Sequence, residues 1–292
     1  MNAETPLTPE LQPGPAPHPR RPFLKMPAGA TDTHFHLFGP QGQYPLVDLR
    51  EYTPPLISPA FARRFFDTMG IQRAVVIQPS VYGEDNRAQL EGMKEIGIAT
   101  RAVIVTPYKT SDREMAIFHE QGARGLRYVL AHPGGLPLSE LERWASRLKE
   151  LNWHIQFLAK GPQILEIAER IEKLACPAVI DHIGMIRPSD GLDQPVFRAV
   201  LRLLAHGHWV KVSGTYRLTE EPKPFRSLIP FIARMVEERP DRIVWASDWP
   251  HVFVKGAVPD TTDLLDALVD WVPDEAARNR ILVDNAAALY GF

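Results

Sequence analysis

From Thr31 to the C-terminus, short β-rich runs alternate with amphipathic stretches of helical length. Eight such pairs follow one another, which is the pattern of repeated strand–helix units around a parallel sheet. Several of the runs are nearly continuous in apolar residues, as expected of strands that are covered on both faces. The predicted strands are Thr31–Phe38, Arg73–Pro79, Arg101–Pro107, Ala123–Val129, Trp153–Ala159, Pro177–Ile183, His208–Gly214 and Arg242–Trp249.

The segments between the strands carry the boundary signals of helices. Ser58 followed by Pro59 is typical of an N-cap with proline in the first turn. Gly70, Gly122 and Gly207 stand where helices are expected to end. Eight parallel strands with eight helices close most naturally into a (β/α)8 TIM barrel, and an open doubly wound sheet is the alternative. Because such barrels occupy about 250 residues as one domain, a length of 292 residues needs no internal linker.

Composition limits what surrounds this barrel. The first 27 residues contain eight of the 28 prolines and lack an apolar signal segment, so we predict an extended tail over 1–27 and a barrel over 28–292. The net charge of −2 argues against a nucleic-acid partner or an anionic membrane surface, and no apolar run reaches the roughly 20 residues of a bilayer span. The single cysteine, Cys176, fits a reducing cytoplasm. The oligomeric state stays open, a homo-oligomer included.

Polar residues interrupt three strands at the end where barrel enzymes place their reactive groups. His34 and His36 are separated by the period of two of a strand, so both imidazoles point into the barrel. One buried histidine would merely satisfy a hydrogen bond, but two inward histidines are costly in a core. Asp181 and His182 end the sixth strand, and Asp248 ends the eighth.

Only closure of the barrel brings these side chains together, because they come from strands 1, 6 and 8. His34, His36, His182 and Asp248 then form either a metal site or an acid–base cluster. Asp181 is equally well interpreted as a structural carboxylate that orients its neighbour.

The sequence resembles the amidohydrolase superfamily, whose mark is a His-x-His after strand 1, a histidine after strand 6 and an aspartate after strand 8. It is most similar to the branch of 2-pyrone-4,6-dicarboxylate lactonases, and the similarity runs from about Gly29 to the C-terminus. The matching segments are Asp32-Thr-His-Phe-His-Leu-Phe-Gly-Pro, Gln78-Pro-Ser-Val-Tyr-Gly-Glu-Asp-Asn, Asp181-His-Ile-Gly and Ser247-Asp-Trp-Pro-His. The resemblance implies a TIM-barrel enzyme that opens a small anionic lactone by attack of water on the ring carbonyl.

The metal ligands expected of many superfamily members are incomplete here. Members that hold zinc or manganese usually add a histidine, a glutamate or a modified lysine from strand 4 or 5. The only histidine of strand 5, His154, stands near the starting end, away from the expected site. The resemblance also implies hydrolysis without a metal, so we predict no required cofactor. Partly occupied zinc or manganese, held by His34, His36, Asp248 and His182, is the alternative.

In the metal-free reading, Asp248 takes a proton from the attacking water. His34, His36 and His182 position that water or donate to the developing oxyanion. The residues alone do not divide the work among the three histidines.

Two arginines are candidates for binding an anionic substrate. Arg127 stands at the outer end of strand 4 and Arg217 follows strand 7, and either could instead be an ordinary ion-pair residue. Both fall where the lactonases have substrate-binding arginines. The resemblance adds Tyr52 and Ser80 as hydrogen-bond donors to the substrate, and His251, which could also act indirectly.

One departure from the lactonases follows strand 4, where they have another arginine and this chain has Ala131-His132-Pro133-Gly134-Gly135. The apparent loss of a carboxylate contact leaves room for a muconolactone-like or sugar-acid lactone as substrate. A sugar-acid lactone isomerase, which would use a substrate hydroxyl in place of water, is the first alternative. A metal-dependent decarboxylase would need the absent histidine of strand 5. A non-catalytic binding protein would have no need of the Asp248 carboxylate.

Overall fold

A computed structural model describes residues 9–16, 19–132, 134–254 and 256–292. Eight parallel strands form one sheet in chain order, β1 to β8, so each strand pairs with its sequence neighbours. The strands are β1 (Thr31–Phe35), β2 (Arg73–Ile77), β3 (Ala99–Ile104), β4 (Ala123–Val129), β5 (His154–Leu158), β6 (Ala178–Ile180), β7 (Trp209–Val212) and β8 (Ile243–Trp245).

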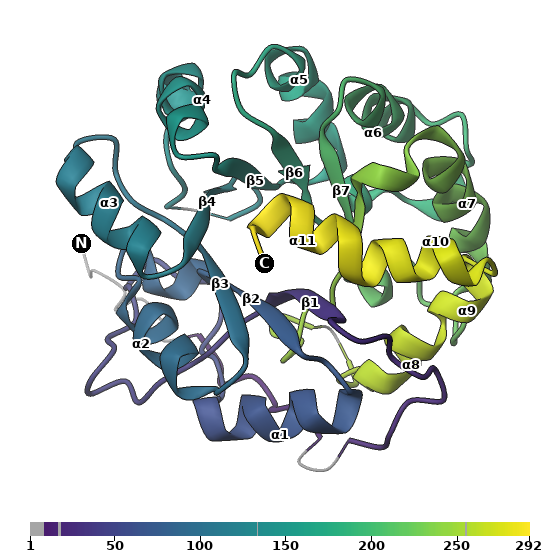
Figure 1. Ribbon diagram of the computed structural model, residues 1–292, viewed down its shortest axis with the longest axis horizontal. Coiled ribbons are helices and arrows are strands. Elements are labelled where there is room, and N and C mark those ends of the chain that lie inside the picture. The colour runs from purple at the N-terminus through teal and green to yellow at the C-terminus, as the bar shows by residue number, and fades with distance from the viewer. Residues whose placement is uncertain (1–8, 17–18, 133, 255) are drawn as a thin grey trace, which may run out of the picture.

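The sheet closes on itself where β1 meets the segment that follows β8. Phe35 forms a parallel bridge with Trp249, the Asp248 amide donates to the His34 carbonyl at 3.0 Å, and the His36 amide donates to the Trp249 carbonyl at 3.0 Å. Figure 1 shows the strands arranged around a common centre with the helices outside them. The structure therefore confirms the predicted (β/α)8 barrel over the open sheet.

Helices surround the barrel. Ser58 is the N-cap of α1 and accepts from the Phe61 amide, and Gly70 ends that helix at a φ of 75°, a left-handed conformation that suits glycine. The helices are α1 (Pro59–Met69), α2 (Arg87–Glu95), α3 (Asp112–Glu120), α4 (Leu141–Glu150), α5 (Gly161–Glu172), α6 (Pro195–Ala205), α7 (Ile229–Glu238), α8 (Thr261–Asp266), α9 (Leu268–Trp271), α10 (Glu275–Asn279) and α11 (Asn285–Tyr290).

The last helix, α11, does not join the outer ring. Figure 1 shows it lying across the barrel. Its buried residues pack against side chains that the strands turn inward, in one cluster of Val75, Ile77, Val103, Val179, Trp209, Val244, Ala286, Leu289 and Tyr290. The C-terminal helix thus fills one end of the barrel interior, which leaves the opposite end for the reactive side chains.

Seven of the predicted strands are too long or shifted, and only β4 has the predicted bounds. The differences matter most at the reactive ends, where β6 stops at Ile180 and β8 at Trp245. His182 and Asp248 have φ values of 51° and 60°, so the backbone turns into the left-handed region and leaves the sheet. Both side chains therefore project from turns just beyond the strands.

The described part of the N-terminal tail lies on the barrel without a regular helix. Leu11 pairs with Thr53 in an isolated bridge, and the Arg20 guanidinium contacts Asp263 and Asp266 at α8. The predicted tail also includes residues 1–8 and 17–18, which lie outside the described residues. Within the part of the chain that the structure describes, none of the helices has the length and apolar character needed to cross a bilayer.

Candidate active site

The two histidines of β1 meet inside the barrel. Both are buried, and their Nε2 atoms lie 3.3 Å apart. His36 Nδ1 lies 2.7 Å from the Ile77 carbonyl oxygen, which can only accept, so Nδ1 has the proton and Nε2 presents a lone pair. Burial lowers the pKa of His36 to about 3 and holds the pKa of His34 well below its usual value, so both rings are neutral at pH 7.

Asp248 faces these histidines with two oxygens in different surroundings. Oδ2 accepts from the Tyr216 hydroxyl at 2.7 Å and from Arg217 Nε at 3.0 Å. Oδ1 is 3.6 Å from His34 Nε2 and 4.0 Å from His182 Nε2. Burial would raise the pKa of Asp248, but Arg217 and the other neighbours outweigh it and hold that pKa well below its usual range. The carboxylate is therefore ionised, with one oxygen bound and one facing the histidines.

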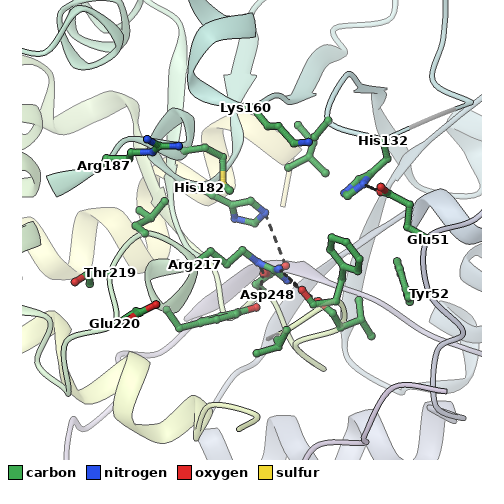
Figure 2. A pocket seen from close by; sticks show the side chains of 18 of the residues that line it. Glu51, Tyr52, His132, Lys160, His182, Arg187, Arg217, Thr219, Glu220 and Asp248 are labelled. Carbon is green, nitrogen blue, oxygen red and sulfur yellow. Dashed lines mark hydrogen bonds and ion pairs between the residues drawn. The ribbon is translucent and has the colours of Figure 1, made fainter. Parts of the chain in front are cut away.

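His182 completes the group from the turn after β6. Its Nδ1 is 2.9 Å from the Ser213 hydroxyl, which can donate or accept. Burial lowers the pKa of His182, so its ring is also neutral. Figure 2 shows His182 and Arg217 both directed at Asp248. The structure thus brings the four predicted catalytic residues together.

Asp181 lies beneath this group and is fully buried. Its Oδ2 accepts from Gln156 Nε2 at 3.0 Å, and its Oδ1 is 3.5 Å from His34 Nδ1 and 3.6 Å from Lys211 Nζ. Burial would raise the pKa of Asp181, but Lys211 and His34 hold it far below its ordinary value. The position suits the structural role that the sequence left open, since Asp181 faces the ring of a catalytic candidate.

The two predicted arginines are differently engaged. Arg127 is buried, donates from Nη1 to the Gln78 carbonyl at 2.6 Å, and has Nη2 3.7 Å from Asp181 Oδ2. Arg217 is bound to Asp248 and also donates to the carbonyls of Val252 and Phe253, at 2.8 and 3.2 Å. Both line the cavity, but much of the Arg217 guanidinium already serves to hold the carboxylate.

Of the three remaining predicted residues, two line the cavity and one lies behind it. Tyr52 and Ser80 line the cavity with Arg127, and burial raises the pKa of Tyr52, so its hydroxyl keeps its proton. His251 is buried behind the cavity, where its Nε2 is 2.6 Å from the Thr261 hydroxyl and its ring packs edge-on against Tyr216. It therefore contacts the residue that binds Asp248.

The cavity above these residues has a volume of about 1100 Å³. Its outer part is lined by Lys160 and Arg187, which have no hydrogen-bonded acidic partner among the described residues. His132, in the segment where the lactonases have an arginine, turns toward Glu51 (Figure 2). Its neighbour Pro133 lies outside the described residues.

Known proteins are similar to this chain over most of its length. The sequence profile described as amidohydrolase matches residues 31–292, which is nearly the entire chain.

The chain belongs to the amidohydrolase family.

Three curated relatives of this amidohydrolase have comparable similarity. It is 34% identical to a 2-pyrone-4,6-dicarboxylate hydrolase of Comamonas testosteroni, over 94% of this chain and 93% of that protein. It is 33% identical to a 4-sulfomuconolactone hydrolase of Hydrogenophaga intermedia, over 91% and 90%. It is 32% identical to a D-galactarolactone isomerase of Agrobacterium fabrum, over 95% and 94%. The relatives confirm the resemblance to lactonases that the sequence motifs indicated.

The site of this amidohydrolase contains side chains of the types that bind metal ions, but the charge of the site does not favour a metal ion. His34, His36 and Asp248 form one candidate ligand set, and His34, Asp181 and His182 form another. Both carboxylates, however, already face cations: Arg217 at Asp248, and Lys211 and Arg127 at Asp181. A dication would add two charges where the carboxylates are already compensated, so the residues do not fit a tightly held metal.

Four residues of the site escaped the sequence analysis. Tyr216 stands beside Arg217, and its place in the loop after a barrel strand is a detectable signal. Lys211 interrupts the apolar run Trp209–Val212, which is a detectable signal. Lys160 and Arg187 stand in loops rich in other polar residues, where nothing in the pattern distinguishes them.

Proposed function

We propose that the protein is a hydrolase that opens a small anionic lactone by attack of water on the ring carbonyl. The observation that supports this most is Asp248, an ionised carboxylate with two different oxygens. Its Oδ2 is bound by Tyr216 and Arg217, and its Oδ1 faces the neutral rings of His34 and His182. Two of the curated relatives named above are lactone hydrolases. A bound, oriented carboxylate with one open oxygen is a competent base for water.

The histidines have different tasks in this mechanism. When the ring proton of His34 is on Nδ1, 3.5 Å from the Asp181 carboxylate, Nε2 of His34 presents a lone pair, as Nε2 of His36 does. The attacking water has two protons, so it donates one to Asp248 Oδ1 and the other to one of these two nitrogens, which lie 3.3 Å apart and orient it toward the substrate.

His182 is the histidine that can donate. When the Ser213 hydroxyl donates to Nδ1 of His182, the ring proton sits on Nε2, which points into the site. We assign to this N–H the stabilisation of the oxyanion that develops on the carbonyl, helped by the Tyr52 and Ser80 hydroxyls at the cavity wall.

The substrate carries negative charge. Arg127 lines the inner cavity, and Lys160 and Arg187 line its outer part, so an anionic lactone meets cations along the cavity. Cations in these positions support substrates like those of the hydrolase relatives. We propose a muconolactone-like or sugar-acid lactone, since His132 stands in the loop where an arginine would have contacted a second carboxylate.

We further propose that no metal ion is required. The support is the charge balance of the buried groups, in which Asp32, Asp181 and Asp248 are matched by Arg127, Lys211 and Arg217. Zinc or manganese that binds weakly at His34, His36 and Asp248 is the alternative.

Removal of divalent metal tests this directly. Exhaustive chelation should leave kcat within about twofold of the untreated enzyme, because the protein's own cations and N–H groups act in the metal's place. Elemental analysis accompanies the assay. A near-stoichiometric metal whose loss abolishes turnover, with recovery on adding zinc or manganese, would show that the nucleophile is metal-activated.

A second candidate is a sugar-acid lactone isomerase, favoured by the similarity to the D-galactarolactone isomerase. Asp248 would then activate a hydroxyl of the substrate in place of water. Both reactions use the same base and the same oxyanion donor.

Turnover of a lactone panel in ¹⁸O-labelled water separates the two. Hydrolysis releases acid and places one ¹⁸O atom in the product carboxylate, whereas isomerisation does neither. The panel should contain 2-pyrone-4,6-dicarboxylate, muconolactones and aldarolactones. If no lactone is converted by either route at the cavity of the folded protein, the proposed function is wrong.

We place the reaction in the cytoplasm, because the single cysteine is buried and has no second cysteine with which to pair. The partner is the small-molecule substrate. Neither nucleic acid nor a membrane surface suits a net charge of −2.

A further inference from the structure

Lys211 is a lysine inside the barrel. It lies on β7 with no exposed surface, in a run that is otherwise apolar. Its ammonium donates to the Thr33 carbonyl and to Gln156 Oε1, each at 2.8 Å, and lies 5.9 Å from the centre of the Tyr290 ring. Lysine is almost never fully buried unless it is paired, so its position requires an explanation.

The charged partner of this ammonium is Asp181. Lys211 Nζ is 3.6 Å from Asp181 Oδ1, and Gln156 bridges them by accepting from Lys211 and donating to Asp181 Oδ2. Lys211 does not line the cavity. It can therefore act on a substrate only through its neighbours.

Asp181 in turn faces the catalytic group. Its Oδ1 is 3.5 Å from His34 Nδ1, and neither atom has a hydrogen-bond partner within the described residues. On the other side of the ring, His34 Nε2 is 3.6 Å from Asp248 Oδ1. A chain of contacts thus runs from the Lys211 cation to the Asp181 carboxylate, and from there through the neutral His34 ring to the Asp248 carboxylate.

We propose that Lys211 is the resident cation of this active site: it holds Asp181 as the carboxylate that orients His34, and it takes the electrostatic place of a divalent metal beside Asp181. Asp181 belongs to a ligand set of kinds that zinc accepts, with His34 and His182. The ammonium compensates this carboxylate without adding the second charge of a dication. Lys211 is a positioning residue, since it touches none of the reacting atoms.

The decisive variant is Lys211→Met, which keeps most of the side-chain length and removes the charge. Zinc chloride binding to the metal-depleted full chain, measured by calorimetry, should become at least tenfold tighter than in the wild type, because Asp181 is left without its cation. A purely structural role for Lys211 would lower the melting temperature and leave the zinc affinity unchanged. Lys173→Met, at an exposed lysine, is the matched control and should leave zinc binding and turnover as in the wild type.

Turnover gives a second readout, which rests on the proposed lactone hydrolysis. Lys211→Met should lower kcat at least tenfold with KM within about threefold, because the cavity wall is intact while His34 loses its orientation. Zinc binding needs no substrate, so the zinc measurement can contradict the role of Lys211 independently of the turnover measurement. If lactones are hydrolysed but zinc affinity does not change, only the role of Lys211 is wrong.

Lys211→Met leaves a buried carboxylate unpaired, which can prevent folding. A second test therefore starts from Asp181→Asn, which removes that carboxylate. Lys211→Met added to Asp181→Asn should leave zinc binding as it is in Asp181→Asn, because the carboxylate that Lys211 compensates is already gone. It should cause no further loss of kcat, because Lys211 acts on His34 only through Asp181. An additional tenfold loss of kcat, or zinc binding that is tenfold tighter than in Asp181→Asn, would overturn the inference.

Discussion

The chemistry of Asp248 depends on the difference between its two oxygens. Tyr216 and Arg217 bind Oδ2, so the carboxylate keeps both its charge and its orientation, and Oδ1 is left facing His34 and His182. The same contacts that depress the pKa of Asp248 make it a weaker base, so its effectiveness has to come from placement. Burial keeps the histidine rings neutral, so their contribution also comes from placement.

Asp248→Asn tests the base. The amide fills the same space but cannot accept a proton from water, so we expect a folded protein whose kcat is lower by about 10²- to 10⁴-fold. Circular dichroism and steady-state turnover are the measurements. A folded variant that retains kcat within tenfold of the wild type would remove Asp248 from this role.

Arg127→Met tests recognition of the substrate's charge. Loss of the guanidinium removes charge-assisted hydrogen bonds, so KM for an anionic lactone should rise at least tenfold, while KM for a neutral analogue stays within about threefold. Arg113→Met, at an exposed arginine of α3, is the control. Equal losses on both substrates would mean that Arg127 only supports Gln78 and Asp181.

The ends of the strands and helices position the side chains of the active site. β6 and β8 stop where His182 and Asp248 enter the left-handed region, and these strained positions lie at the reactive end of the barrel. Helix α1 has the opposite kind of end, with a capped N-terminus and an extended N-cap backbone. In α1 the Ser58 side chain accepts from the Phe61 amide, and the helix packs Phe65 flat against Trp249, in the segment after Asp248.

Ser58→Ala tests this cap. Removal of the hydroxyl leaves a helix amide without its partner, so the free energy of unfolding should fall by about 1 kcal/mol. Urea denaturation is the measurement, and Ser58→Asp, which restores an acceptor, should keep most of the stability. A Ser58→Ala variant as stable as the wild type would show that the cap contributes nothing.

Many ionisable groups inside the barrel are neutral, or form ion pairs, only in the folded state. Burial lowers the pKa of His36, His154 and His251 to about 3, against an ordinary value of about 6.5. Below about pH 6.5 the unfolded chain binds protons that the folded chain does not, so stability falls as pH falls. The paired carboxylates act in the same direction at lower pH, because protonation removes their ion pairs.

His154→Leu measures one such contribution away from the active site. His154 is buried against Tyr290, and at about pH 5 its neutral ring should cost the folded state about 2 kcal/mol relative to neutral pH. The loss of unfolding free energy between pH 7 and pH 5 should therefore be about 2 kcal/mol smaller in His154→Leu than in the wild type. His206→Leu, at an exposed histidine, is the control. Equal pH dependence in both variants would contradict the lowered pKa of His154.

Local pattern was enough for the eight strand–helix units and for the inward direction of His34 and His36, because a strand alternates its side chains with a period of two. The same period turns Lys211 inward, but its partner Asp181 is 30 residues earlier in the chain. Pairings of this kind, such as Tyr216 and Arg217 with Asp248 or α11 with the barrel interior, exist only after the sheet closes. Closure determines which distant strand ends meet, and a period within one strand contains no information about them.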